Sequence, residues 1–311
     1  MSVLTKPVHK NKIKMDTASR VYTIVIYILV TLTTLVLTYP LYFVIIASFS
    51  DPNAVALGDT IFWFKGFTIE PYKNILKEES LITGYKNSFI YMIFGTIYQL
   101  VLTILAGYVC SKNKLPGHKF ILWFFFITMY VGGGTIPTYL TIKNLKLLNN
   151  PLVMIINVGV SAYYMLVVRQ FFSSSIPKDL YEAADIDGAS EFRQFLSIAL
   201  PLSKPIIAVI ALYYAFGKWN SFYTALLYLK KQDLWPLQLF LRNLLISASS
   251  LGTAATGGEG GDGASNTANN AEATEQLRYA LIVISTVPVL VAYAVVQKYF
   301  KGGVMVGSVK G

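Results

Sequence analysis

Residues 182–201 read EAADIDGASEFRQFLSIALP and form a polar stretch in a chain whose other long segments are mostly apolar. Apolar side chains recur at helical spacing on both sides of Gly188. This pattern predicts two short amphipathic helices that meet at the glycine, where the backbone can adopt conformations that other residues resist. Pro177 suits a first helical turn, and Asp179 and Glu182 place negative charge near a helix N-terminus. Because apolar segments precede and follow it, we expect this element to lie outside the bilayer and to contact a partner.

The chain of 311 residues has the composition of a protein with several transmembrane segments. Hydrophobic residues make up 54% and charged residues 14%, and the mean hydropathy is +0.53. Cys110 is the only cysteine, which excludes an intrachain disulfide and a cysteine-based metal site. His9 and His118 lack metal-ligand spacing. We therefore expect an all-α integral membrane protein without a metal site.

Six apolar segments are long enough to cross a bilayer, for which about 20 residues suffice. They cover residues 21–49, 87–111, 120–142, 147–168, 205–229 and 279–297. We expect Pro40 to kink or end the first helix. The GGGTIP run at residues 132–137 predicts that the third helix unwinds or packs closely on a neighbour.

The segments outside these spans predict tails and loops. We expect cytoplasmic tails at residues 1–20 and 298–311 and extracytoplasmic loops at residues 50–86 and 230–277. Residues 251–276 contain mostly Gly, Ala, Ser, Thr and Asn without an aromatic residue, which predicts disorder. No GxxxxGK[ST] run occurs in the chain, so it carries no Walker-type ATP site.

Lysine and arginine are distributed unevenly over the predicted loops. The two tails and residues 111–119 and 169–204 hold 15 of the 26 Lys and Arg but only 6 of the 16 Asp and Glu. The more positive side of a membrane protein is the cytoplasmic one. Both termini and residues 182–201 are therefore expected in the cytoplasm. The net charge of +10 is explained by topology and gives no reason to expect a nucleic-acid partner.

Residues 182–201 match the cytoplasmic signature of the membrane subunits of bacterial ABC importers, which is EAA, three residues, G, nine residues and I-x-L-P. The seven matching positions are Glu182, Ala183, Ala184, Gly188, Ile198, Leu200 and Pro201. The segments GGGTIPTYLTIKNLKLLNN, LPLSKPIIAVIALYYAFGKWNSFYTALLYL and VMVGSVKG resemble the carbohydrate-uptake branch, the maltose-type permeases. They look most similar to Gram-positive polysaccharide- or oligosaccharide-uptake permeases. The resemblance covers residues 20–311, apart from 251–272.

This resemblance implies a type I ABC importer fold of six transmembrane helices, with its core at residues 84–297. The protein would be a multi-pass permease for an oligosaccharide in the cytoplasmic membrane of a bacterium. Residues 177–201 would be the coupling loop, which lies in a groove on a cytoplasmic ATPase. The residues implied in coupling are Glu182, Ala183, Ala184, Asp187, Gly188, Phe192, Leu200 and Pro201.

The resemblance also implies the partners of the chain. They are two ATPase subunits, an extracytoplasmic sugar-binding lipoprotein and a second permease, which is more readily a homologue than a copy. ATP and magnesium would bind to the ATPase, so this chain itself would carry no cofactor.

Aromatic and amide side chains inside the spans are candidates for sugar contact, because sugars stack on aromatic faces and form directional hydrogen bonds. Trp219 and Asn220 are the first candidates, since the WNSF segment is common in the sugar branch. Further candidates are Tyr213, Tyr214, Tyr223 and Lys218 in the fifth span, Asn157, Tyr163 and Tyr164 in the fourth, and Tyr98 and Gln99 in the second. The alternative is that these residues belt the membrane interface or fill helix contacts.

Lys218 is a separate case because a cation inside a span usually faces a cavity or a partner charge. One hypothesis is that it attracts an acidic oligosaccharide, such as one containing uronic acids. The alternative is that it snorkels to the outer interface. Equal loss of neutral and acidic oligosaccharide uptake in Lys218→Met would contradict charge recognition.

Two other classes of function stay open at this point. A secondary transporter driven by an ion gradient would need ionisable groups inside spans, and Lys218 is nearly alone there. A membrane-embedded enzyme of sugar metabolism would need a constellation such as paired carboxylates or HExxH. The one acidic cluster, Asp179, Glu182, Asp185 and Asp187, falls inside the coupling signature.

Overall fold

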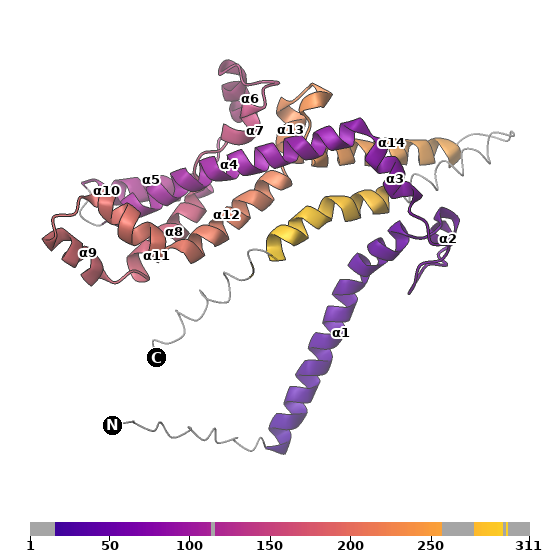
Figure 1. The fold of residues 1–311 in the computed structure, drawn as a ribbon, viewed down its shortest axis with the longest axis horizontal. Helices are drawn as coiled ribbons and strands as arrows, with labels where there is room; N and C mark the ends of the chain where they lie inside the picture. The colour runs from indigo at the N-terminus through magenta and orange to yellow at the C-terminus, as the bar shows by residue number, and fades with distance from the viewer. Residues whose placement is uncertain (1–15, 113–115, 257–276, 295–296, 298–311) are drawn as a thin grey trace, which may run out of the picture.

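A long helix, α4 (Glu79–Ser111), forms the centre of the fold. The computed structural model describes residues 16–112, 116–256, 277–294 and 297, and these residues form helices and loops without a strand. Helices α12 (Lys204–Trp219) and α8 (Ala162–Ser174) pack along α4 (Figure 1). Small residues allow this close approach, since a Cβ at Gly107 would lie 2.6 Å from Val168 Cγ1.

The remaining helices differ widely in length. They are α1 (Thr17–Ser48), α2 (Pro52–Ala56), α3 (Glu70–Lys77), α5 (His118–Tyr130), α6 (Thr135–Asn144), α7 (Leu152–Ile156), α9 (Lys178–Ile186), α10 (Glu191–Gln194), α11 (Leu200–Leu202), α13 (Phe222–Tyr228) and α14 (Leu237–Thr256). A π-helical turn at Phe195–Ala199 joins α10 to α11, and a 3₁₀ turn at Gln232–Leu234 precedes α14. The final helix, Leu277–Ala294, is the unlabelled yellow one in Figure 1.

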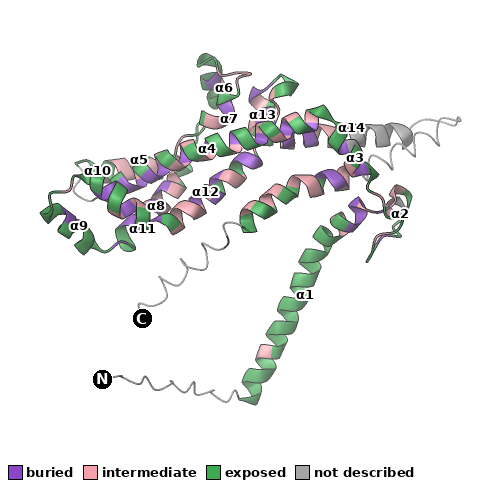
Figure 2. Ribbon diagram, viewed as in Figure 1, coloured by how far each residue is buried: buried purple, intermediate pink, exposed green. Residues whose placement is uncertain are grey.

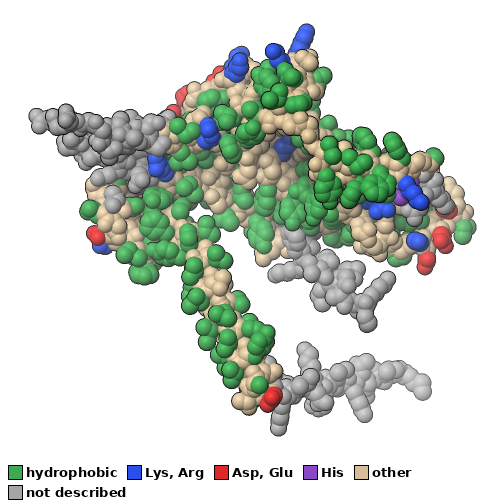
Figure 3. Space-filling model, turned by 180° about the vertical axis from the view of Figure 1, so that it is seen from behind, with side chains coloured by type: hydrophobic (Ala, Val, Ile, Leu, Met, Phe, Trp, Pro, Cys, Tyr) green, Lys and Arg blue, Asp and Glu red, His purple; other side chains and the backbone are tan. Residues whose placement is uncertain are grey.

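Three helices in the described part of the chain are long and apolar enough to cross a membrane, namely α1, α4 and Leu277–Ala294. Two bent pairs add further candidates: α5 with α6 at 113°, and Glu191–Leu202 with α12 at 79°. Helix α1 projects from the other helices and is exposed along nearly its whole length (Figure 2). Hydrophobic side chains cover it (Figure 3). A helix that is apolar all round is stable in a lipid environment.

The ends of the first two predicted spans differ from the structure. Helix α1 begins inside the predicted tail 1–20 and continues through Pro40 to Ser48. Of the two alternatives, an end at Pro40 is therefore wrong, and a kink there stays a prediction. Transmembrane helices tolerate proline because neighbouring groups satisfy the freed carbonyl. The predicted loop 50–86 contains α2 and α3, and α4 starts within it at Glu79.

The third, fourth and fifth predicted spans are interrupted helices. The break between α5 and α6 coincides with the GGGTIP run, as predicted. The continuous helix expected at residues 147–168 is wrong, because α7 ends at Ile156, residues 157–161 are not helical, and α8 follows. The span expected at residues 205–229 divides into α12 and α13.

Helix α14 replaces much of the second predicted loop, residues 230–277. Leu237, Leu239, Phe240 and Leu241 are buried, and Ser88 Oγ accepts a hydrogen bond from Leu237 N at 2.8 Å. This apolar face packs on α4, which accounts for a helix where the composition indicated a loop. The disorder predicted for residues 251–276 is wrong for 251–256. Residues 257–276, most of the N-terminal tail and the tail 298–311 lie outside the described residues.

Candidate functional site

The signature stretch folds into two helices that meet at Gly188, as predicted. Helix α9 ends at Ile186, and Gly188 has a φ of +70°, in the left-handed region that favours glycine. Ala189 N donates to Ala184 O at 2.9 Å, which closes the turn. Ser190 then begins α10, with its hydroxyl accepting from Arg193 N at 3.4 Å. The chain thus reverses over a few residues and sets the two helices at an angle.

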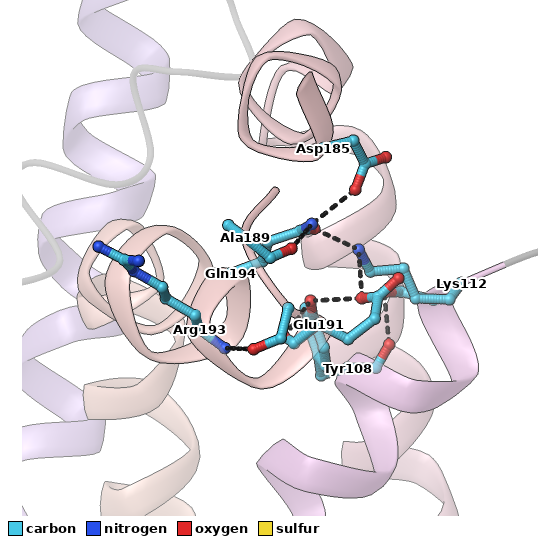
Figure 4. Close-up of polar contacts among 9 residues, drawn as sticks. Tyr108, Lys112, Asp185, Ala189, Glu191, Arg193 and Gln194 are labelled. Atoms are coloured by element: carbon cyan, nitrogen blue, oxygen red, sulfur yellow. Dashed lines mark hydrogen bonds and ion pairs between the residues drawn. The ribbon is translucent and has the colours of Figure 1, made fainter. Parts of the chain in front are cut away.

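The helix pair is attached to the end of the central helix (Figure 4). Lys112 Nζ lies 3.1 Å from Glu191 Oε2, and Tyr108 OH donates to the same oxygen at 3.3 Å. The ammonium group also lies 4.0 Å from the ring centroid of Tyr181. Burial, together with the negative charge of Glu191, raises the pKa of Tyr181, so its hydroxyl stays neutral. These contacts connect the helix pair to the C-terminal end of α4.

Gln194 connects the two helices of the loop to each other. Its side chain is 2% exposed, and Nε2 donates to Asp185 Oδ1 at 2.6 Å and to Ala189 O at 3.1 Å. Its Oε1 accepts from Lys112 Nζ at 3.5 Å. A buried amide with each of its polar atoms bonded fixes the angle between the helices. Sequence reasoning missed Gln194, Lys112 and Glu191, because only the folded chain brings them together.

Most of the residues implied in coupling face outward. Ala184 is buried and Leu200 is half-buried, whereas the other six are exposed: Glu182, Ala183, Asp187, Gly188, Phe192 and Pro201. Phe192 is 68% exposed, and Ile186, which the motif does not include, is 87% exposed. The loop therefore presents large apolar side chains beside acidic ones, an arrangement typical of an interaction surface.

A cavity of about 210 Å³, with polar and aromatic side chains in its lining, lies between α4, α12 and the break between α7 and α8 in the fourth predicted span. Its lining residues are Gln99, Met154, Asn157, Val158, Tyr164, Tyr213, Tyr214, Gly217, Lys218, Ser221 and Thr224. The cavity brings together six of the sugar-contact candidates from three predicted spans, namely Gln99, Asn157, Tyr164, Tyr213, Tyr214 and Lys218.

Tyrosine rings form one wall of this cavity. The ring of Tyr164 stacks on Tyr213 at a centroid distance of 5.7 Å and meets Tyr214 edge-on at 5.0 Å. The hydroxyl of Tyr214 is hydrogen-bonded to Thr103 Oγ1 at 2.6 Å, which fixes the ring. Aromatic faces beside amide and hydroxyl groups can stack on and hydrogen-bond a polar ligand.

Five candidates lie outside the cavity, and one of them, Tyr98, is half-buried on α4. Trp219 is 2% exposed and packs against Tyr85 and Phe89, and its Nε1 donates to Ser285 O at 3.3 Å. The amide of Asn220 donates to Phe216 O, in the preceding turn. Tyr163 and Tyr223 are 58% and 53% exposed. Sugar contact by these five stays a prediction that this cavity does not support.

The charged groups of the interior are few. Among the residues whose burial the structure describes, Lys218 is the one charged side chain that is buried. No group of three or more His, Cys, Asp or Glu residues with metal-binding geometry occurs in the described ranges. The cavity thus offers hydrogen-bonding and stacking groups for binding.

An all-helical fold with spans of membrane length, a cavity lined by polar and aromatic side chains, and an anchored, outward-facing helix pair is typical of a membrane-embedded transport subunit. Residues 80–306 match the family described as "Binding-protein-dependent transport system inner membrane component". The chain belongs to this family. It is therefore an inner-membrane transport subunit rather than an enzyme, and it works with a solute-binding protein and with separate ATPase subunits that hydrolyse ATP.

Relatives share most of the chain. Protein LplC of Bacillus subtilis (strain 168) is 35% identical over 88% of this chain and 89% of its own length. The polygalacturonan/rhamnogalacturonan transport system permease protein YtcP of the same organism is 32% identical over 94% and 99%. The crystal structure of a bacterial ABC transporter involved in the import of the acidic polysaccharide alginate has a chain that superimposes with a TM-score of 0.81. That chain is 28% identical, with coverage of 92% of this chain and 99% of its own length.

Proposed function

We propose that this chain is one permease of an ATP-driven importer for an oligosaccharide, and that acidic oligosaccharides are its substrate class. The names of two similar proteins support this proposal, one a polygalacturonan/rhamnogalacturonan permease and the other a chain of an alginate importer. The observation that carries it in this chain is the cavity, in which tyrosine rings and amide groups converge.

The size of the cavity supports a two-subunit path. Its volume of about 210 Å³ is below the roughly 300–1,000 Å³ of ordinary small-molecule sites. An oligosaccharide therefore needs a larger binding cavity, and a second permease that faces this cavity supplies its other side. We propose a homologous permease as this second subunit.

The coupling loop is the contact with the ATPase in this proposal. Phe192 and Ala183 enter an apolar groove on one ATPase subunit, and Glu182 meets a basic residue there. ATP and magnesium bind between two ATPase subunits and not in this chain. An extracytoplasmic sugar-binding lipoprotein delivers the substrate from the opposite side of the membrane.

Adjacent tyrosines provide a matched test of the substrate site. Tyr164 lines the cavity, whereas Tyr163 is 58% exposed and does not line it. Thermal shift of the cognate binding protein against a panel of acidic and neutral oligosaccharides first identifies the sugar. Uptake of that sugar into proteoliposomes is then expected to fall about tenfold or more in Tyr164→Ala, because a stacking face is lost. Tyr163→Ala should keep most of the uptake, and equal losses in the two variants would contradict the assignment of the cavity.

A further inference from the structure

The break in the fourth span lies beside the cavity and leaves main-chain groups without helical partners. Helix α7 has only five residues, and residues 157–161 between α7 and α8 are not helical. The last carbonyls of any helix lack an intrahelical donor. At membrane depth, irregular backbone is tolerated where other protein groups or a water-filled cavity satisfy its carbonyls.

Side chains from α4 and α12 provide these bonds. Gln99 Nε2 donates to Val158 O at 3.1 Å, and Ser161 N donates to the hydroxyl of Tyr214 at 3.2 Å. Lys218 Nζ donates to Met154 O at 2.7 Å, to Ile155 O at 3.1 Å and to Asn157 Oδ1 at 3.2 Å. The ammonium group thus closes the open C-terminal end of α7, where positive charge is also favoured by the helix dipole.

Gly95 on α4 makes room for the lysine stem. A Cβ at Gly95 would lie 2.7 Å from Lys218 Cε and 3.0 Å from Cδ. The side chain runs across this glycine and is 8% exposed, which contradicts the alternative that it snorkels to the membrane interface. The glycine and the lysine therefore form one unit with the end of α7.

We propose that Lys218 is a positioning residue whose ammonium group fixes the break in the fourth span and thereby the wall of the cavity. An ammonium group has three N–H donors, and the structure directs three bonds to protein oxygens. No donor is left for a carboxylate of the substrate in this conformation. Lys218 sets the shape of the substrate path, and other groups recognise the charge of the sugar. This inference does not depend on the identity of the sugar.

Cysteine labelling at the break tests this role without a substrate. The complete transporter is prepared with Cys110→Ala and Gly159→Cys in this chain, and the rate of modification by a small water-soluble maleimide is measured. A Cβ at Gly159 meets other atoms only at 3.7 and 3.8 Å, so the reporter fits.

Lys218→Met keeps the stem and removes the donors. We expect labelling about tenfold faster, since bonds from a charged donor are lost. Lys204→Met, an exposed lysine at the start of α12, is the control and should label as the parent does. An unchanged rate in Lys218→Met would overturn the proposal.

A double-mutant cycle tests the unit formed by Gly95 and Lys218. Gly95→Ala keeps every donor but displaces the stem, so it should also speed labelling. In the Lys218→Ala background the added methyl group has room, and Gly95→Ala should add no further increase. Equal increases in both backgrounds would contradict the proposed unit. If the Lys218 variants do not assemble, the labelling rate of Gly95→Ala alone tests the proposal, and an unchanged labelling rate in this variant overturns it.

Substrate selectivity separates positioning from charge recognition. The probes are trigalacturonic acid and the same trisaccharide with its carboxyl groups reduced, and the readout is sugar-stimulated ATP hydrolysis. Lys218→Met should lower the stimulation by both probes by the same factor, whereas a loss confined to the acidic probe would overturn the proposal. If neither probe stimulates the parent transporter, trigalacturonic acid is not its substrate, and the labelling rate still decides the role of Lys218.

Discussion

Gly188 offers a direct way to disturb the coupling loop without touching the membrane core. Its φ of +70° lies in the left-handed region, and a Cβ at this position would meet no atom within 4 Å. Gly188→Val therefore adds backbone strain and no clash. This strain costs about 1–2 kcal/mol for an ordinary L-residue and more for a β-branched one. The population of the native turn relative to rearranged ones should fall about five- to thirtyfold.

The assay is ATP hydrolysis by the reconstituted transporter, with and without sugar-loaded binding protein. We expect Gly188→Val to abolish most of the stimulation while the chain still inserts and assembles. Gly188→Asn should retain more of it, because asparagine tolerates the left-handed region. Gly117→Val is the matched control, since Gly117 has a φ of +74°, no atom within 4 Å of its added Cβ, and a place outside the coupling loop. Normal stimulation in Gly188→Val, or equal losses in Gly188→Val and Gly117→Val, would refute the reasoning.

Two further substitutions test contacts inside the chain. Gln194→Leu leaves Asp185 and the half-buried carbonyl of Ala189 without their donor. Thermal unfolding of the purified transporter should therefore show a loss of stability of about 1–3 kcal/mol, and an unchanged unfolding midpoint would contradict the role of the amide. Gly107→Ala places a methyl group against Val168 and should destabilise the fold by about 1–3 kcal/mol. Adding Val168→Ala should recover part of this loss of stability. An equally large loss in the double variant would show that the contact is not the cause.

The coupling loop could be predicted from sequence because its determinants are local. Gly188 marks the turn, and the apolar spacing defines the two helices. The cytoplasmic side, which the distribution of lysine and arginine indicates, stays a prediction. The break between α5 and α6 was likewise visible, because glycine and proline occur together at residues 132–137.

The break in the fourth span has no comparable local signal. Residues 157–161 read NVGVS, without proline, and the helix ends there because Gln99, Tyr214 and Lys218 on other helices satisfy the main chain. Trp219 also shows that sequence patterns do not reveal tertiary packing. The association of WNSF with sugar uptake is sequence information, while the packing of this ring against Phe89 depends on the fold.

The central claim is that energy reaches this permease from a separate ATPase through residues 177–201. The most direct test is sugar uptake into proteoliposomes that contain the complete transporter, the binding protein outside, and either ATP or an imposed proton or sodium gradient. We predict uptake only with ATP inside and the binding protein present, and its loss in Glu182→Lys although the chain still inserts. Uptake driven by an ion gradient without ATP, or full uptake in Glu182→Lys, would contradict the account.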